Sequence, residues 1–247
     1  MKQIDLVQGS EEWHAFRRGK ITGTRLGDVY SDKPYNATDV KSMLFNFGIE
    51  FKKSAPIKEL VALLPAGAEQ QLIRSSPKKI GFYETIAERL AIPADDENVM
   101  DRGLRLEDEA AQEFAKRYNK VVAEDGCWQS DDDERIINSP DRYVVPEKGK
   151  PITEAVEIKC LNSARHIEAV IENTIPSTYD SQIIQYFIVN ENLETLYFVF
   201  YDPRVQSVPF HCIEVTRESL GDLPEKYKKF QLEQLAEMDR IVERLAF

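Results

Sequence analysis

The chain has few cysteines and no long apolar run, and each shortage excludes a class of protein. Its three cysteines, Cys127, Cys160 and Cys212, lie far apart and form no CxxC pair. This excludes a disulfide framework, a zinc ribbon and a four-cysteine iron–sulfur site. No apolar run approaches the roughly 18 residues of a membrane span, and the N-terminus lacks the apolar segment of a signal peptide. We therefore expect a cytoplasmic protein that does not bind membranes.

Basic residues are also in short supply. Lys and Arg number 32 against 43 Asp and Glu, which gives a formal net charge of −11. Such a balance excludes a protein that coats nucleic acid through a generally basic surface. Disorder is excluded because 42% of the residues are hydrophobic and 10% are aromatic. A chain of this length can bury a full core, so we predict a single domain over residues 1–247, with about 35–79 as a mostly helical insertion or cap.

Hydrophobic periodicity predicts an α/β protein with helices flanking a mixed central β-sheet. A first helix is expected to begin after Ser10, which can cap it. Further helices are expected at 82–90, 104–118, 163–172, 179–189 and 224–245. Strands are expected at 121–124, 135–145, 154–161, 196–201 and 210–215. The turn-forming sequence PEKGKP between the second and third strands predicts that they form a hairpin.

The hairpin carries the most informative residues, Ser-Pro-Asp ending at Asp141 and Glu-Ile-Lys at 157–159. Side chains alternate along a strand, so Glu157 and Lys159 share a face while Val156 and Ile158 face the core. Asp141 can then stand beside Glu157. Two carboxylates and an ammonium group suit a Mg²⁺-dependent phosphodiesterase, and the spacing is typical of a PD-(D/E)xK nuclease core. The alternative for Glu-x-Lys alone is an ordinary cross-strand salt bridge on a solvated face.

Two more acidic residues and two glutamines are candidates for the same site. Glu107 lies on the apolar face of the helix at 104–118, where a carboxylate needs a cation beside it. The alternative is a first-turn glutamate favoured by the helix dipole. Asp131 opens an Asp-Asp-Asp-Glu run, which in most proteins is a solvated turn. Gln182 and Gln185 lie one helical turn apart and could position water or substrate.

The N-terminal segment reverses the general charge of the chain. Between Trp13 and Arg25 it contains four basic residues and no acidic one. Arg17, with the hydroxyl group of Thr24 nearby, could form a phosphate pocket from a guanidinium fork and hydroxyl donors. The alternative is a basic helix face that covers Trp13.

Five motifs in order, QGSEEWHAFRRGKITGTRLGDV, GLRLEDEAAQEF, INSPDRYV, VEIKC and YDSQIIQY, resemble the YqaJ-type viral recombinase and lambda exonuclease family. The resemblance covers nearly the whole chain apart from about 35–79. It implies a restriction-endonuclease-like fold. The implied activity is Mg²⁺-dependent 5′→3′ digestion of linear duplex DNA with 5′-phosphate ends, which leaves a 3′ single strand for recombination by annealing. It also implies a homotrimeric ring, a single-strand annealing protein as partner, and a bacterial host cell if the chain is of phage origin.

The resemblance also implies roles for particular residues. Two Mg²⁺ ions, for which Mn²⁺ is expected to substitute, would be held by Asp141, Glu157 and the carbonyl of Ile158, with Glu107 and Asp131 as the adjoining acidic positions. Lys159 would be the catalytic lysine and Gln182 the helix glutamine, although Gln185 matches almost as well. The 5′-phosphate and DNA site would comprise Trp13, Arg17, Thr24, Ser139 and Arg165. Arg142 stands where the family usually has glycine.

Two other functions remain open at this point. An endonuclease with the same core, such as a restriction or junction-resolving enzyme, would share the metal residues but would also cut a closed circle. A non-catalytic module that binds DNA ends or a partner protein would keep the fold without the activity. The intact Asp141, Glu157 and Lys159 argue against the second alternative.

Overall fold

The computed structural model describes residues 7, 9–22, 26–29, 37–68, 78–92, 99–124 and 126–246. The chain divides into two units. The first unit comprises Met1–Asp96, Asn162–Asn173 and Asp202–Pro209, and the second comprises Glu97–Leu161, Thr174–Tyr201 and Phe210–Phe247. The single domain expected from the sequence stays a prediction. None of the helices in these described ranges has an apolar stretch long enough to cross a membrane.

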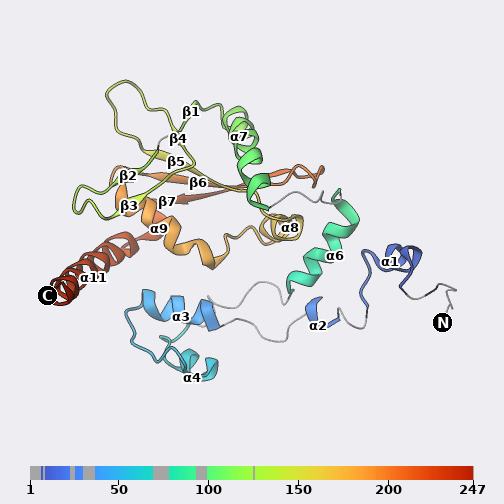
Figure 1. Ribbon diagram of the computed structural model, residues 1–247, viewed down its shortest axis with the longest axis horizontal. Helices are drawn as coiled ribbons and strands as arrows, with labels where there is room; N and C mark the ends of the chain where they lie inside the picture. Colours follow the sequence, from blue (N-terminus) through green and yellow to red (C-terminus); the bar gives the residue numbers. More distant parts are fainter. Residues whose placement is uncertain are drawn as a thin grey trace. The chain divides into compact units, whose positions relative to one another are not determined.

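The first unit is helical (Figure 1). Its helices are α1 (Glu11–Arg17), α2 (Leu26–Val29), α3 (Ala37–Asn46), α4 (Ile57–Ala62), α6 (Ile80–Leu90) and α8 (Ser163–Glu172). Tyr83 and Ala87 of α6 pack against Ala164 and Ile167 of α8 in one small core. Helices α3 and α4 form a separate core within the segment 35–79, of which residues 35, 36 and 69–77 lie outside the described ranges.

Helix α1 begins as the sequence predicts, because the Ser10 side chain accepts a hydrogen bond from the backbone N–H of Trp13 at 3.1 Å. The helix ends at Arg17, and Gly19 follows with a positive φ of 68°. Two consecutive residues of α6 hold this turn. Glu88 accepts from the Gly19 N–H at 2.5 Å, and Arg89 donates to the Gly19 carbonyl at 2.6 Å.

The second unit contains a five-stranded mixed sheet in the order β1-β4-β5-β6-β7. Its strands are β1 (Val122–Ala123), β4 (Arg142–Val144), β5 (Glu154–Lys159), β6 (Thr195–Tyr201) and β7 (Phe210–Thr216). Only β5 and β6 are parallel, and the other neighbouring pairs are antiparallel. The β4–β5 pairing, with Arg142 opposite Val156, confirms the predicted hairpin.

Two short strands, β2 (Trp128–Gln129) and β3 (Ile137–Asn138), form a separate antiparallel ribbon that the sequence did not reveal. The single strand expected over 135–145 is wrong, because it is split at Ser139–Pro140 into β3 and β4. Pro140 has no N–H to donate to a sheet, which favours a break at this position. The break sets the conformation of the chain immediately before Asp141.

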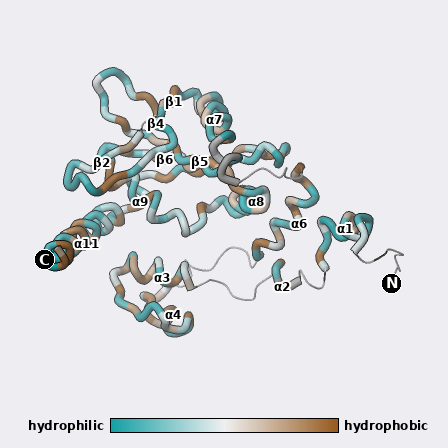
Figure 2. Tube along the Cα trace, in the orientation of Figure 1, coloured by the Kyte–Doolittle hydropathy of each residue, from teal (hydrophilic) through white to brown (hydrophobic). Residues whose placement is uncertain are grey.

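Helices cover both faces of the five-stranded sheet (Figure 1). Helix α7 (Val99–Tyr118) packs Leu106, Ala110 and Phe114 against Val156 and Ile158 of β5. Helix α9 (Asp180–Val189) lies on the opposite face, preceded by a 3₁₀ turn (Ser177–Tyr179). The short α10 (Arg217–Leu220) and the long α11 (Leu223–Leu245) complete the chain. Figure 2 shows both hydrophilic and hydrophobic residues along α11.

Candidate active site

The centre of the candidate site is formed where the end of β5 meets the residue before β4. In the antiparallel register Arg142 pairs with Val156, so Asp141 lies beside Glu157 on the face opposite α7. One Asp141 carboxylate oxygen (Oδ2) accepts a hydrogen bond from the backbone N–H of Ile158 at 2.6 Å. The structure therefore brings together the two carboxylates that the sequence singles out, and it places the Ile158 backbone next to them.

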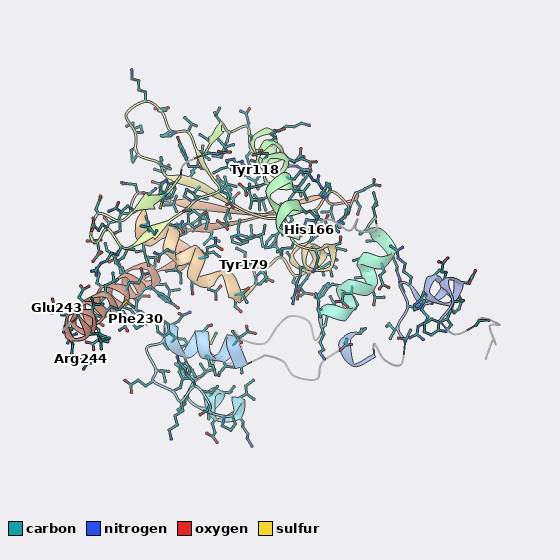
Figure 3. The ribbon with its side chains drawn as sticks, in the orientation of Figure 1. Tyr118, His166, Tyr179, Phe230, Glu243 and Arg244 are labelled. Carbon is teal, nitrogen blue, oxygen red and sulfur yellow. The ribbon has the colours of Figure 1, made fainter. Side chains whose placement is uncertain are left out.

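Three side chains donate hydrogen bonds to the buried carboxylate of Glu157, which is 1% exposed. Lys159 and Gln182 both donate to Oε1, the latter at 2.5 Å, and Tyr186 donates to Oε2. Helix α9 supplies the glutamine and the tyrosine. Tyr179, labelled in Figure 3 just before α9, lies with its ring centroid 5.2 Å from the Lys159 ammonium. The lysine is thus held between a carboxylate and an aromatic face.

The electrostatics of this pair favour a bound cation. Burial raises the pKa of Asp141 to about 7, and the negative charges of Glu157 and Glu107 contribute to the rise. Burial also raises the pKa of Tyr186 above its ordinary range, so its hydroxyl group remains a donor at neutral pH. Two like charges this close are costly unless a cation compensates them. The donor set of Asp141, Glu157 and a backbone carbonyl therefore fits a hard divalent ion such as Mg²⁺.

No group of three or more His, Cys, Asp or Glu side chains among the described residues is arranged to hold a metal ion by itself. This does not conflict with a Mg²⁺ site, because Mg²⁺ is commonly bound by one or two carboxylates and keeps several water ligands. Any ion here would rest mainly on Asp141 and Glu157.

The other two predicted acidic positions lie in different surroundings. The Glu107 carboxylate is 2.9 Å from the Arg142 guanidinium, so its neighbouring cation in this structure is a side chain. Asp131 lies exposed in the turn between β2 and β3. The two residues that follow it pair with basic groups, Asp132 with Lys228 of α11 and Asp133 with Arg135. The ion pairs indicate that this acidic run joins the turn to α11.

The structure shows which of the two candidate glutamines of α9 lies at the site. Gln182 reaches Glu157, whereas Gln185 donates to the Ile137 carbonyl of β3 at 3.1 Å. The Gln185 side chain also accepts from Gln231 of α11 at 2.6 Å. Gln182 is thus the glutamine that contacts the acidic pair, and Gln185 ties the ribbon to the helices.

The residues predicted to bind the 5′-phosphate are distributed over both units. In the first unit, the Arg17 guanidinium lies 4.2 Å from the centroid of the Trp13 ring, and Arg165 pairs with Glu168 at 2.7 Å. Ser139 lies exposed in the second unit, just before Asp141. Thr24 lies outside the described residues. The phosphate site therefore stays a prediction.

Sequence reasoning missed Tyr186 and Tyr179 as parts of this site. Tyr186 stands four residues after Gln182, one helical turn further along the same face of α9. That spacing is the only signal in the sequence, and it is equally typical of a core tyrosine.

The mixed sheet, with an acidic pair and a lysine at the meeting of β4 and β5, defines a protein of the restriction-endonuclease-like fold. The chain belongs to the YqaJ-like viral recombinase domain family, whose model matches residues 12–192, well over half of its length. The expected family and fold class are both confirmed. Comparison with curated protein sequences finds no match.

Two solved structures resemble the chain over almost all of its length. One is an alkaline exonuclease from Laribacter hongkongensis, with 22% identity and a TM-score of 0.51. The match covers 96% of this chain and 98% of the exonuclease chain. The other is the same exonuclease in complex with dAMP, with 23% identity, the same TM-score and the same coverage. At this identity the likeness establishes the fold.

Proposed function

We propose that the protein is a Mg²⁺-dependent exonuclease that digests one strand of linear duplex DNA from its 5′ end. The observation that carries the proposal is the pairing of Asp141 with the buried Glu157, whose carboxylate also accepts hydrogen bonds from Lys159 and Gln182. Membership of a viral recombinase family and the fold of an alkaline exonuclease support it. The 3′ single strand left behind would serve recombination by strand annealing.

In this proposal Asp141, Glu157 and the Ile158 carbonyl would hold the metal. A bound Mg²⁺ ion would neutralise charge on the scissile phosphate and lower the pKa of a water ligand. Side chains of the protein would orient the metal ligand and the attacking water. Tyr186 and Gln182 fix the orientation of the Glu157 carboxylate. Lys159, which lies at the end of β5, orients the attacking water and stabilises the charge that develops on the phosphate.

End selection is assigned to the basic segment of the first unit. The Arg17 guanidinium would hold the terminal 5′-phosphate, with hydroxyl groups of Thr24 and Ser139 as further donors and Arg165 as a second basic contact. We further propose that the enzyme acts as a homotrimeric ring together with an annealing protein. A ring would retain DNA by enclosing it, whereas the acidic surface of the chain would not attract DNA by its charge.

One digestion experiment tests activity, polarity and end dependence together. Linear duplexes labelled separately at each 5′ and 3′ end are incubated with the protein and Mg²⁺, alongside a relaxed closed circle. We expect early release of the 5′ label, late release of the 3′ label and an intact circle, and no release in EDTA. Cutting of the circle would identify an endonuclease instead, and absence of hydrolysis under all conditions would indicate a binding module.

A further inference from the structure

Arg142 carries a buried positive charge at the edge of the candidate active site. The residue is 7% exposed, and its guanidinium donates to Glu107 at 2.9 Å and to the backbone carbonyl of Asp141. Its other terminal nitrogen (Nη2) donates to Asp108 and lies 3.1 Å from Glu124. One arginine thus meets three carboxylates and the backbone of a proposed metal ligand.

The register of the sheet explains this position. Arg142 pairs with Val156, and Val156 packs with Leu106 beneath α7. The Arg142 side chain therefore emerges on the α7 face, where Glu107 lies, while Asp141 one residue earlier faces Glu157. Arg142 thus pairs with carboxylates on the α7 face and contacts the active-site residue Asp141 through its backbone carbonyl.

This arrangement changes the number of carboxylates that remain for metal ions. The charge of Glu107 is already met by the guanidinium group of Arg142. Asp131 lies exposed in the turn between β2 and β3, next to residues that pair with other groups. A second divalent ion at Glu107 would have to displace the guanidinium group, because Nη1 of Arg142 already occupies a Glu107 carboxylate oxygen at 2.9 Å. The pair of Asp141 and Glu157 remains, which suffices for one ion.

We propose that Arg142 serves as a resident cation in place of a second metal ion, so that each chain binds a single divalent cation in its active site. The proposal rests on the metal-dependent function proposed above, and it departs from the two ions that the family resemblance implies. The guanidinium group of Arg142 would supply the positive charge beside Glu107.

The test counts bound metal without any measurement of activity. Mn²⁺ is titrated into the full chain without DNA, and the bound ions per chain are determined by calorimetry and by the electron paramagnetic resonance signal of free Mn²⁺. We expect one ion for the wild type and for Arg142→Lys, which keeps the charge. Arg142→Gln, which removes it, should bind two. Adding Glu107→Gln to Arg142→Gln should restore one, because the second ion would lose its carboxylate.

Arg135→Gln is the matched control. Arg135 also pairs with two carboxylates, Asp133 and Asp239, but at the β2–β3 turn and α11. This variant should bind one ion, as the wild type does.

The outcomes separate the inference from the proposed function. Two ions on the wild type, or one ion on an Arg142→Gln protein with native circular dichroism, would overturn the inference and leave metal-dependent hydrolysis standing. No bound ion on the wild type would overturn both. The number of ions bound by the wild type tests the inference even if Arg142→Gln fails to fold.

Discussion

The hydroxyl group of Tyr186 donates a hydrogen bond to Oε2 of Glu157 inside the second unit, where the two residues are 0% and 1% exposed. Burial and the charge of Glu157 raise the pKa of this tyrosine, so the group donates at any working pH. With Gln182 and Lys159 on Oε1, all the hydrogen bonds needed to fix one carboxylate orientation are supplied by the protein. A ligand carboxylate held in this way is preorganised for its metal.

We therefore predict that Tyr186→Phe lowers the turnover number by roughly 10–100-fold, as is typical for loss of a group that orients a metal ligand. Stability should fall by about 1–3 kcal/mol, because a buried charged acceptor loses its donor. Steady-state kinetics and thermal unfolding measure both effects. Tyr197→Phe is the control, since Tyr197 donates to Glu154 at 2.9 Å, at the other end of β5. It should lose stability alone, and equal activity losses for both variants would contradict the assigned role of Tyr186.

Substitutions of the two glutamines of α9 should have different effects on activity and on stability. Gln182→Ala removes a donor from Glu157 and should lower activity by roughly 10-fold or more, with a small change in melting temperature. Gln185→Ala removes the contacts to β3 and α11 and should lower stability by about 1 kcal/mol while activity is retained. Parallel measurements of turnover and unfolding test both. A larger activity loss in Gln185→Ala would reverse the assignment.

The elements that the sequence predicted well have strong local signals. Helix α8 lies at 163–172 as expected, because the Asn162 side chain caps its first turn and Asn173 ends it in a left-handed conformation. Strand β5 alternates core and site residues as its sequence indicates. Strand β2 was missed, and β3 was not separated from β4, because two-residue strands carry no periodicity.

The candidate site was predictable only where its residues lie close together in the sequence. Asp141, Glu157 and Lys159 belong to one hairpin and show as a motif. The partners of Arg142 lie 34 and 35 residues away on α7, and Tyr186 lies 29 residues from Glu157. Such pairs depend on how helices pack on the sheet, which the spacing of residues in one sequence does not reveal. The same applies to Gln182 and Gln185, which only the packing of α9 distinguishes.

Lys159→Ala should abolish hydrolysis and leave DNA binding largely intact. The ammonium group lies at the acidic pair, and general acid–base groups contribute about 10²–10⁴-fold to a rate. Digestion of a 5′-phosphorylated duplex and fluorescence anisotropy with a labelled duplex measure the two properties. Lys120→Ala is the matched control, because Lys120 pairs with Glu154 of the same strand at 2.8 Å, away from Asp141. Wild-type digestion by Lys159→Ala would contradict the proposed mechanism.

Arg17→Ala should remove the preference for 5′-phosphorylated over 5′-hydroxyl ends. The guanidinium of Arg17 stacks on Trp13 at the end of α1. The turn that follows in the sequence, at Gly19, is held by two hydrogen bonds to α6. Initial rates on the two kinds of end give the preference directly. Arg18→Ala, one residue further along and exposed, should keep the preference. If Arg17→Ala lowers both rates equally, Arg17 does not read the phosphate.

Asp141→Asn should stabilise the metal-free protein, and the gain should grow as pH rises from 5 to 8. The ordinary pKa of this carboxyl is 3.8, and in the folded protein it is about 7. Between these values the folded state binds a proton that the unfolded state has lost, so the wild type loses stability as pH rises through this range. Asparagine carries no charge and escapes this loss. After allowance for the weakened hydrogen bond from Ile158, we expect a gain of roughly 1–3 kcal/mol at pH 8, or about 2–4 °C for each kcal/mol.

Thermal unfolding in EDTA at several pH values measures this difference between variant and wild type. Asp133→Asn provides a control of opposite sign. The guanidinium of Arg135 lowers the pKa of Asp133 to about 2, so its charge favours folding above the ordinary pKa and its removal should give no gain at pH 8. A gain for Asp141→Asn that is the same at pH 5 and pH 8 would show that the pKa of Asp141 is not raised in the folded protein. Adding Mg²⁺ should narrow the gain at pH 8, because the ion compensates the charge that the variant lacks and binds the wild type more tightly.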